Sequence, residues 1–194
     1  MFLFCNEKTP HLCGFQVFRN HLRLFLYERN EHMRAAIIMG STSDLPKMEP
    51  AVGILKEYGV TVDVRCLSAH RAHAGLSAFL EEANNNGTEV IIAAAGMAAA
   101  LPGVVASQTV LPVIGVPLSG SVLDGMDALM SIVQMPPGIP VATVAINGGK
   151  NAAHLALQIM AVSRPELREK LLAARVKMEE DAMKANAEVI AKFQ

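Results

Sequence analysis

The stretch AAIIMGSTSD at residues 35–44 decides the fold. Its first five residues are all apolar, which is typical of a strand buried on both faces of a sheet. Gly40 and the polar residues 41–44 then indicate a turn and the start of a helix. The free backbone N–H groups and the dipole at such a helix start favour a bound phosphate. Ser43 or Asp44 equally fits as a simple N-terminal cap.

The alternation of strand and helix continues along the chain. Further strands are expected at 60–66, 89–95, 112–116 and 140–146, and helices at about 45–58, 74–84, 98–107, 126–133, 151–162 and 165–192. Strands that alternate with helices predict an α/β protein with a parallel sheet covered on both faces. Ligands of such sheets bind at the carboxyl ends of the strands, so the candidate site residues are those that directly follow each strand.

Composition narrows the function classes. The 194 residues are 52% hydrophobic and 18% charged, with a net charge of −1. Such a chain folds, and its apolar content predicts a homo-oligomer in which partner subunits cover part of the surface. It lacks the basic excess of a nucleic-acid-binding protein and the apolar run of about 18 residues needed to span a membrane. The three cysteines are too few for a disulfide framework, which predicts a reducing cytoplasm, and Cys66 is expected in the core.

The chain divides into three parts. Residues 1–32 contain six of the nine aromatic residues and form an atypical extension, which is either dispensable or, through an amphipathic arm at 18–27, docks on a neighbouring subunit. Residues 33–163 form the α/β domain. Residues 164–194 form a helix whose apolar stripe is expected to pack on that domain or on a neighbouring subunit.

Two segments behind predicted strands carry candidate chemistry. The segment Ser68-Ala69-His70-Arg71 combines a histidine, a residue type that titrates near neutrality, with an arginine. An arginine guanidinium can bind a phosphate through two hydrogen bonds. Beside the loop at 41–44 it predicts a site for an anionic substrate with one acid–base group, although a lone His is often structural. The small residues 94–103 indicate either tight helix packing or close backbone approach to a flat ligand. No metal-binding motif is present, so no metal is proposed.

Four segments in order resemble the PurE family of purine biosynthesis over about residues 35–162. They are Gly40-Ser41-Thr42-Ser43-Asp44, Ser68-Ala69-His70-Arg71, Leu101-Pro102-Gly103 and residues 131–143, SIVQMPPGIPVAT. The resemblance implies a flavodoxin-like three-layer sandwich with a parallel five-stranded sheet and a long C-terminal helix. It also implies an octamer whose active sites lie between subunits, and a reaction without metal or organic cofactor.

The resemblance further implies an enzyme that acts on a ribonucleotide and CO2. The mutase class interconverts N5-carboxyaminoimidazole ribonucleotide and 4-carboxyaminoimidazole ribonucleotide, whereas the carboxylase class adds CO2 directly to aminoimidazole ribonucleotide. Ser-Ala-His-Arg resembles the mutase class. By resemblance His70 is the general acid/base, and the substrate-binding residues are Ser41, Ser43, Asp44, Ser68, Ala69, Arg71, Ala95, Gly96 and Leu101.

The chain departs from the family pattern at three places. Leu45 replaces a common Trp, Ala72-His73 replaces Thr-Pro, and Ala100 stands where the mutases have a His. The last departure lies by the expected imidazole site. It keeps open a PurE-like protein that binds a ribonucleotide without this catalysis, or a relative that acts on nicotinate-derived nucleotides.

Overall fold

The structure, a computed structural model, describes residues 32–194. In chain order its elements are β1 (Arg34–Met39), the 3-10 turn η1 (Thr42–Asp44), α2 (Leu45–Glu57), β2 (Thr61–Cys66), α3 (His73–Asn85), β3 (Val90–Gly96), α4 (Leu101–Ala106), β4 (Val113–Leu118), α5 (Met126–Val133), β5 (Ala142–Thr143), α6 (Gly149–Ala161) and α7 (Pro165–Phe193). The predicted arm at 18–27 lies outside the described residues.

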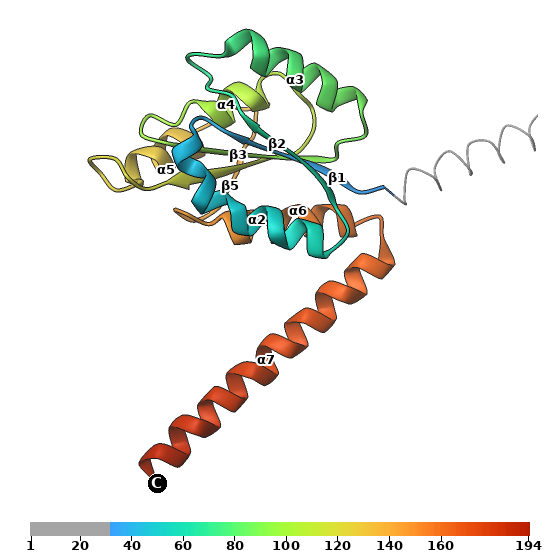
Figure 1. The fold of residues 1–194 in the computed structure, drawn as a ribbon, viewed down its shortest axis with the longest axis vertical. Helices are drawn as coiled ribbons and strands as arrows, with labels where there is room; N and C mark the ends of the chain where they lie inside the picture. Colours follow the sequence, from blue (N-terminus) through green and yellow to red (C-terminus); the bar gives the residue numbers. More distant parts are fainter. Residues whose placement is uncertain (1–31) are drawn as a thin grey trace, which may run out of the picture.

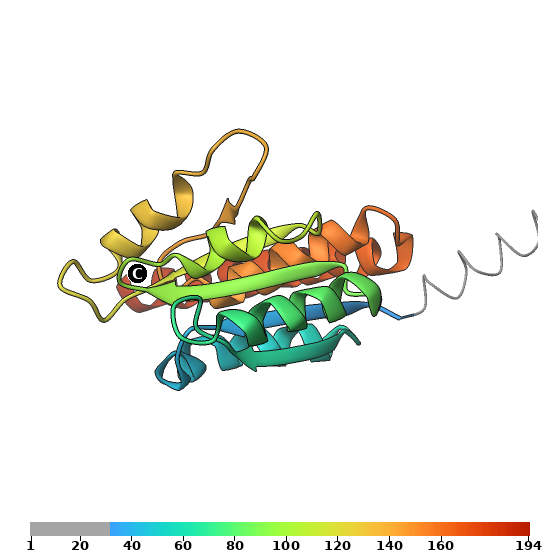
Figure 2. The same ribbon diagram turned by 90° about the horizontal axis from the view of Figure 1, so that it is seen from above.

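The five strands form one parallel sheet in the order β2-β1-β3-β4-β5. Helices α2 and α6 cover one face of the sheet, and α3, α4 and α5 cover the other (Figure 1; Figure 2 views the same layers from above). The predicted three-layer α/β fold is therefore confirmed. Because β1 leads to β2 on one side and then to β3 on the other, the strand order reverses between β1 and β3.

Each central strand contributes to two cores, because successive side chains point to opposite faces. In β1, Ile37 packs with the core under α2 and α6, whereas Ile38 packs with the core under α3 and α4. Helix α5 packs closely on β4 at Gly115, where an added Cβ would meet the side chain of Ile132 and lie 2.8 Å from that of Val141. A residue without a side chain is needed there for α5 to approach the sheet.

The prediction that Cys66 is a core residue is wrong. Cys66 is exposed and free, because it ends β2, a strand at the edge of the sheet that is only partly covered. An alternating pattern identifies a strand but does not say whether the strand is central or at an edge.

The fifth strand is much shorter than the predicted 140–146. β5 pairs with β4 only through Ala142 and Thr143. Pro140 has no N–H to donate to a ladder, and beyond the strand single bonds from Val144 N to the Gly115 carbonyl (3.1 Å) and from Asn147 N to the Pro117 carbonyl (2.8 Å) hold the chain. The segment follows the edge of the sheet without regular pairing.

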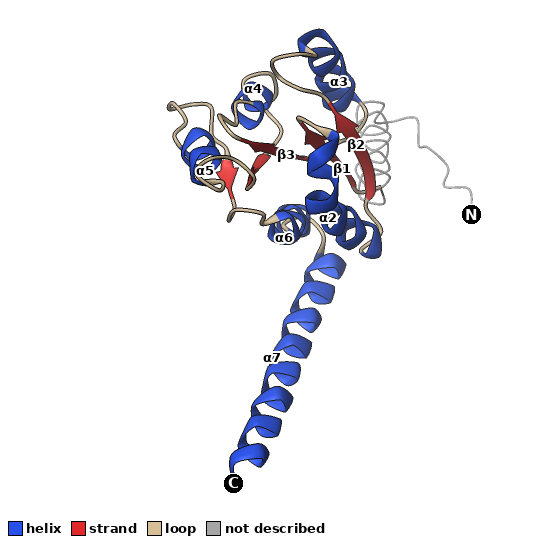
Figure 3. Cartoon of the chain, turned by 60° about the vertical axis from the view of Figure 1, so that its left-hand side comes forward, coloured by secondary structure: helices blue, strands red, loops and turns tan. Residues whose placement is uncertain are grey.

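Helix α7 starts on the domain and then leaves it. The guanidinium group of Arg164 donates hydrogen bonds to both carboxylate oxygens of Glu89, from Nη1 to Oε2 (2.7 Å) and from Nη2 to Oε1 (3.0 Å). This pair connects the α6–α7 turn to the start of β3. Leu167 is buried, and beyond the next turns the helix projects away from the sheet (Figures 1 and 3). Among residues 32–194, no helix is both long enough and apolar enough to cross a membrane.

Candidate functional site

A cavity of about 460 Å³ opens at the carboxyl ends of β1 and β3, where the strand order reverses. This is the crevice in which open α/β sheets bind their ligands. Loops that are far apart in the sequence supply its walls. All ten predicted site residues line it: Ser41, Ser43, Asp44, Ser68, Ala69, His70, Arg71, Ala95, Gly96 and Leu101.

The loop after β1 is organised by Ser41. Its hydroxyl oxygen accepts hydrogen bonds from the backbone N–H of Ser43 (3.3 Å) and from the Ser43 hydroxyl (2.8 Å), which caps the short turn η1. Asp44 stands at the cap position of α2 but makes no capping hydrogen bond. The prediction that the side chain of Ser43 or Asp44 caps the helix is therefore wrong, because Ser41 provides the capping oxygen. The Asp44 carboxylate remains available to the cavity.

Burial raises the pKa of the Asp44 carboxyl above its ordinary value of 3.8. A backbone hydrogen bond at Ser41 and the positive charge of Lys47 oppose this rise. Desolvation dominates because burial penalises the charged form of the carboxyl. The cavity thus contains a carboxyl group, that of Asp44, whose pKa is set by burial, by the backbone at Ser41 and by Lys47.

The loop after β2 presents His70 and Arg71. The Ser68 carbonyl accepts hydrogen bonds from the N–H groups of Arg71 (3.3 Å) and Ala72 (2.9 Å), which closes a tight turn just before α3. Leu67 N donates to the Met39 carbonyl at 2.8 Å and ties this loop to the end of β1. The imidazole and the guanidinium are exposed on the wall of the cavity, free to meet a ligand.

The loop after β3 supplies a wall of small groups. Ala95 and Leu101 are almost fully buried, and a Cβ at Gly96 would lie 3.3 Å from the Leu118 carbonyl oxygen. Met97 adopts a positive φ of 57°, a strained conformation for a residue with a side chain, and is exposed at the rim. Ala100 also faces the cavity. The prediction of tight packing is confirmed by the burial of these residues, whereas close backbone approach to a flat ligand stays a prediction.

Three further residues line the same cavity: Lys47, which sequence reasoning missed, and Ser119 and Gly120, which follow a predicted strand but were given no role. Lys47 donates from Nζ to the carbonyl oxygen (2.7 Å) and the hydroxyl (3.3 Å) of Ser119. Asn147, which has a positive φ of 56°, holds Ser119 in turn by a pair of hydrogen bonds of 3.1 and 2.8 Å. The only signal for Lys47 was its place in the first turn of the helix that follows the serine-rich loop.

Other candidate segments lie elsewhere in this chain. Gly138, Ile139 and Pro140 of the Pro- and Gly-rich loop line a different cavity, near the start of β4. His154 borders a groove between α6 and α7. Within residues 32–194, no group of three or more His, Cys, Asp or Glu side chains could hold a metal ion.

Comparisons with known proteins agree with this arrangement. Residues 34–181 match the sequence model of a family described as AIR carboxylase. The chain is 54% identical over 143 residues to the N5-carboxyaminoimidazole ribonucleotide mutase of Pyrococcus horikoshii, covering 74% of this chain and 81% of that protein. It is 50% identical over 158 residues to the phosphoribosylaminoimidazole carboxylase of Saccharomyces cerevisiae, covering 81% of this chain but 26% of that protein. The crystal structure of Treponema denticola PurE superposes with a TM-score of 0.74 at 26% identity, covering 81% of this chain and 98% of that one.

Proposed function

Because this chain belongs to the AIR carboxylase family, we propose that it interconverts N5-carboxyaminoimidazole ribonucleotide and 4-carboxyaminoimidazole ribonucleotide in purine biosynthesis. The similar protein of Pyrococcus horikoshii bears the name of this mutase activity. The Saccharomyces cerevisiae relative is named a carboxylase, but this chain matches only about a quarter of it. The mutase is therefore the activity that the comparisons favour.

One structural observation carries the proposal. A single cavity at the strand-order reversal is lined by an acid–base group, a guanidinium and the polar residues of a helix start: His70, Arg71, Ser41, Ser43 and Asp44. Arg71 and the hydroxyls of Ser41 and Ser43 suit a phosphate, and Asp44 suits the hydroxyls of a ribose. The imidazole ring of the substrate would then lie against Ala95, Gly96 and Leu101, with His70 beside it.

The reaction follows from these positions. As the carbamate C–N bond breaks, CO2 leaves, the electron pair stays on the nitrogen and His70 donates a proton to it. Carbon 4 of the substrate imidazole attacks the retained CO2, a C–C bond forms, and His70 removes the proton from that carbon. His70 ends as it began, and such a double role requires a group that titrates near neutrality. Holding CO2 beside the ring replaces a bimolecular encounter by a local one.

Confinement of CO2 requires a more closed site than one chain provides. His70, Arg71, Met97 and Ala98 are all exposed in the isolated chain. A neighbouring subunit over this rim would exclude water from the cavity, which supports a homo-oligomer, an octamer by resemblance, with its sites between subunits. A cytoplasmic location belongs to the same proposal and is supported by the low cysteine content.

The test supplies the two possible substrates separately. With N5-carboxyaminoimidazole ribonucleotide and no ATP, we expect 4-carboxyaminoimidazole ribonucleotide to form. With aminoimidazole ribonucleotide and bicarbonate, we expect little turnover. Efficient turnover of the second mixture would instead assign the carboxylase reaction. Binding of the ribonucleotide without conversion in either mixture would contradict the proposal and favour the non-catalytic alternative that Ala100 raised.

A further inference from the structure

The hydroxyl group of Ser119 is held from two sides just beyond the carboxyl end of β4. Its oxygen lies 3.3 Å from Nζ of Lys47 and 2.8 Å from Nδ2 of Asn147. The ammonium group of a lysine has hydrogen-bond donors and no acceptor, so it donates to this oxygen. Lys47 therefore occupies one of the two acceptor positions of the hydroxyl.

The backbone of Ser119 fixes the orientation of the Asn147 amide. The N–H group of Ser119 donates to Oδ1 of Asn147 at 3.1 Å. If the amide were turned over, its NH2 group would face this N–H group, and two donors would meet. Nδ2 therefore points at the Ser119 hydroxyl and donates to it. The second acceptor position of the hydroxyl oxygen is occupied in this way.

One hydrogen-bond donor of Ser119 is left unused. Its carbonyl oxygen accepts from Lys47 at 2.7 Å, its N–H group donates to Asn147, and its hydroxyl oxygen accepts twice. A serine hydroxyl has two acceptor lone pairs and one donor, so only the hydrogen of the O–H group remains. Among residues 32–194, no group accepts this hydrogen. Because Ser119 lines the candidate site, the hydrogen is available to a ligand there.

The surroundings of this hydrogen suit a negatively charged acceptor. The ammonium group of Lys47 donates to the hydroxyl oxygen, and hydrogen bonds in such a chain polarise one another, which strengthens the O–H donor. The positive charge of the ammonium group also attracts an anion. Hydrogen bonds to an ionised acceptor are about twice as strong as those between neutral groups. An anionic oxygen of the substrate is therefore the expected partner.

The strand order indicates which anionic group Ser119 meets. Ser119 follows β4 and Arg71 follows β2, and these strands are three positions apart in the order β2-β1-β3-β4. Neighbouring strands lie about 4.8 Å apart, so β2 and β4 are separated by about 14 Å. A phosphate bound by Arg71 therefore lies beyond the reach of Ser119. Strand β4 adjoins β3, whose loop faces the substrate ring in the proposed function, and the anionic group beside that ring is the carboxylate.

We propose that the Ser119 hydroxyl donates a hydrogen bond to the carboxylate of the ribonucleotide, and so favours carboxylated ligands over those without this group. Ser119 is then a specificity-determining residue, and Asn147 is the positioning residue that turns the hydroxyl hydrogen toward the cavity. The inference deepens the proposed function, because it assigns a further contact at the same site, and it rests on that function.

The first experiment compares two ligands by calorimetric titration of the full chain carrying His70→Asn, in which conversion is expected to be slow. Both ligands have the phosphate, but 4-carboxyaminoimidazole ribonucleotide has a carboxylate and aminoimidazole ribonucleotide has none. We expect Ser119→Ala to raise the Kd of the carboxylated ligand about tenfold or more, because a hydrogen bond to a charged group is lost. The Kd of aminoimidazole ribonucleotide should stay the same. An equal increase for both ligands would overturn the inference.

The second experiment redirects the hydroxyl hydrogen without removing it. In Asn147→Asp, one carboxylate oxygen accepts from the Ser119 N–H group and the other accepts the hydroxyl hydrogen, because an aspartate has no donor. We expect the Kd of 4-carboxyaminoimidazole ribonucleotide to rise at least as much as in Ser119→Ala. The new negative charge also repels the ligand, but that part of the effect persists without the hydroxyl. The effect of Asn147→Asp should therefore be smaller in a chain that also carries Ser119→Ala, and equal effects in both chains would contradict the inference.

The matched control is Ser121→Ala. Ser121 lies in the same loop, but its hydroxyl already donates to Oδ1 of Asp127 at 2.6 Å, and it does not line the cavity. We expect both Kd values of this variant to match those of the chain with Ser121. Melting temperatures of all the variants establish that they are folded.

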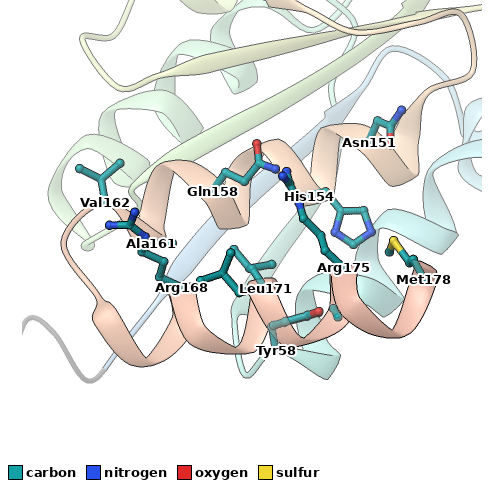
Figure 4. A pocket seen from close by; sticks show the side chains of 12 residues that line it. Tyr58, Asn151, His154, Gln158, Ala161, Val162, Arg168, Leu171, Arg175 and Met178 are labelled. Carbon is teal, nitrogen blue, oxygen red and sulfur yellow. The ribbon is translucent and has the colours of Figure 1, made fainter. Parts of the chain in front are cut away.

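The same titrations separate a failure of this inference from a failure of the proposed function. If neither ribonucleotide binds to the wild-type chain, both are contradicted. If both ligands bind and Ser119→Ala leaves the Kd of 4-carboxyaminoimidazole ribonucleotide unchanged, the inference alone is overturned. Binding of the anion in the groove between α6 and α7, where Arg168 and Arg175 lie, would give this second result (Figure 4).

Discussion

The ammonium group of Lys47 lies 2.7 Å from the carbonyl oxygen of Ser119, although 72 residues separate them in the sequence. The contact joins the first turn of α2 to the loop that follows β4, and both line the candidate site. Lys47 also places a positive charge near Asp44. It therefore acts as a positioning residue that fixes one wall of the cavity and favours the ionised state of its acid.

Replacing Lys47 by Met is expected to lower kcat/KM about tenfold, since a hydrogen bond to a charged group contributes about 1.5–3 kcal/mol. The loss should appear mainly in KM, because the reacting groups remain. Steady-state kinetics measure it. Lys56→Met, at the exposed far end of α2, is the matched control and should leave both constants unchanged. An equal effect of the two substitutions would deny Lys47 a role in the site.

Replacing His70 by Asn is expected to lower kcat by about 100-fold to 10,000-fold, the usual contribution of a general acid/base. Asn keeps a polar side chain but cannot shuttle a proton, so the Kd of the product ribonucleotide should change little. Single-turnover kinetics and calorimetric titration separate the two quantities. His73→Asn, three residues further at the start of α3 and outside the cavity lining, serves as the control. Retained activity in His70→Asn would remove the imidazole from the mechanism.

Replacing Arg71 by Met is expected to raise KM about 100-fold, since it removes the proposed bidentate ligand of the substrate phosphate. Arg71→Lys should recover only part of this loss, because an ammonium group is a point charge without the planar fork. The side chain is exposed, so neither substitution should alter the melting temperature much. Unchanged KM values would place the phosphate elsewhere.

Replacing Asp44 by Asn is expected to change the pH dependence of stability. The folded-state pKa of Asp44 lies above 3.8, so the folded protein binds the proton more tightly than the unfolded chain. The free energy of unfolding therefore falls as pH rises from 3.8 through the folded-state pKa, and Asp44→Asn lacks this decline. The variant should be more stable than the wild type at pH 7, with a difference that narrows toward pH 4. Denaturant unfolding at both pH values measures it, and a difference independent of pH would contradict the expectation.

Two glycine substitutions should have opposite effects on stability. Gly115→Ala adds a methyl group against Ile132 and Val141, and overpacking of this kind costs about 1–3 kcal/mol. Gly53 is exposed in the middle of α2, and a Cβ added there would meet no atom within 4 Å. Gly53→Ala should therefore raise the free energy of unfolding by about 0.5–1 kcal/mol. Thermal melting of both variants tests the pair. A neutral Gly115→Ala would mean that α5 can shift away from the sheet.

The buried strands could be predicted because their apolar runs are local features of the sequence. The residues that follow β1, β2 and β3 could be placed in one site because parallel strands end at the same edge of a sheet. The exposure of Cys66 and the shortness of β5 could not be predicted in this way, because they depend on which strands occupy the edges. Lys47 was missed for a related reason, since its partner Ser119 is brought near only by the complete fold.

The brevity of β5 affects how this molecule behaves when crowded. An open margin of a sheet can template the addition of foreign strands and so nucleate fibrils. The edge formed by β5 offers a ladder of only two residues. Pro136, Pro137 and Pro140, in the segment that precedes β5, lack the N–H groups that an incoming strand would need. The chain therefore resists the addition of a foreign strand on this side, whereas the opposite edge, the six-residue strand β2, lacks this protection.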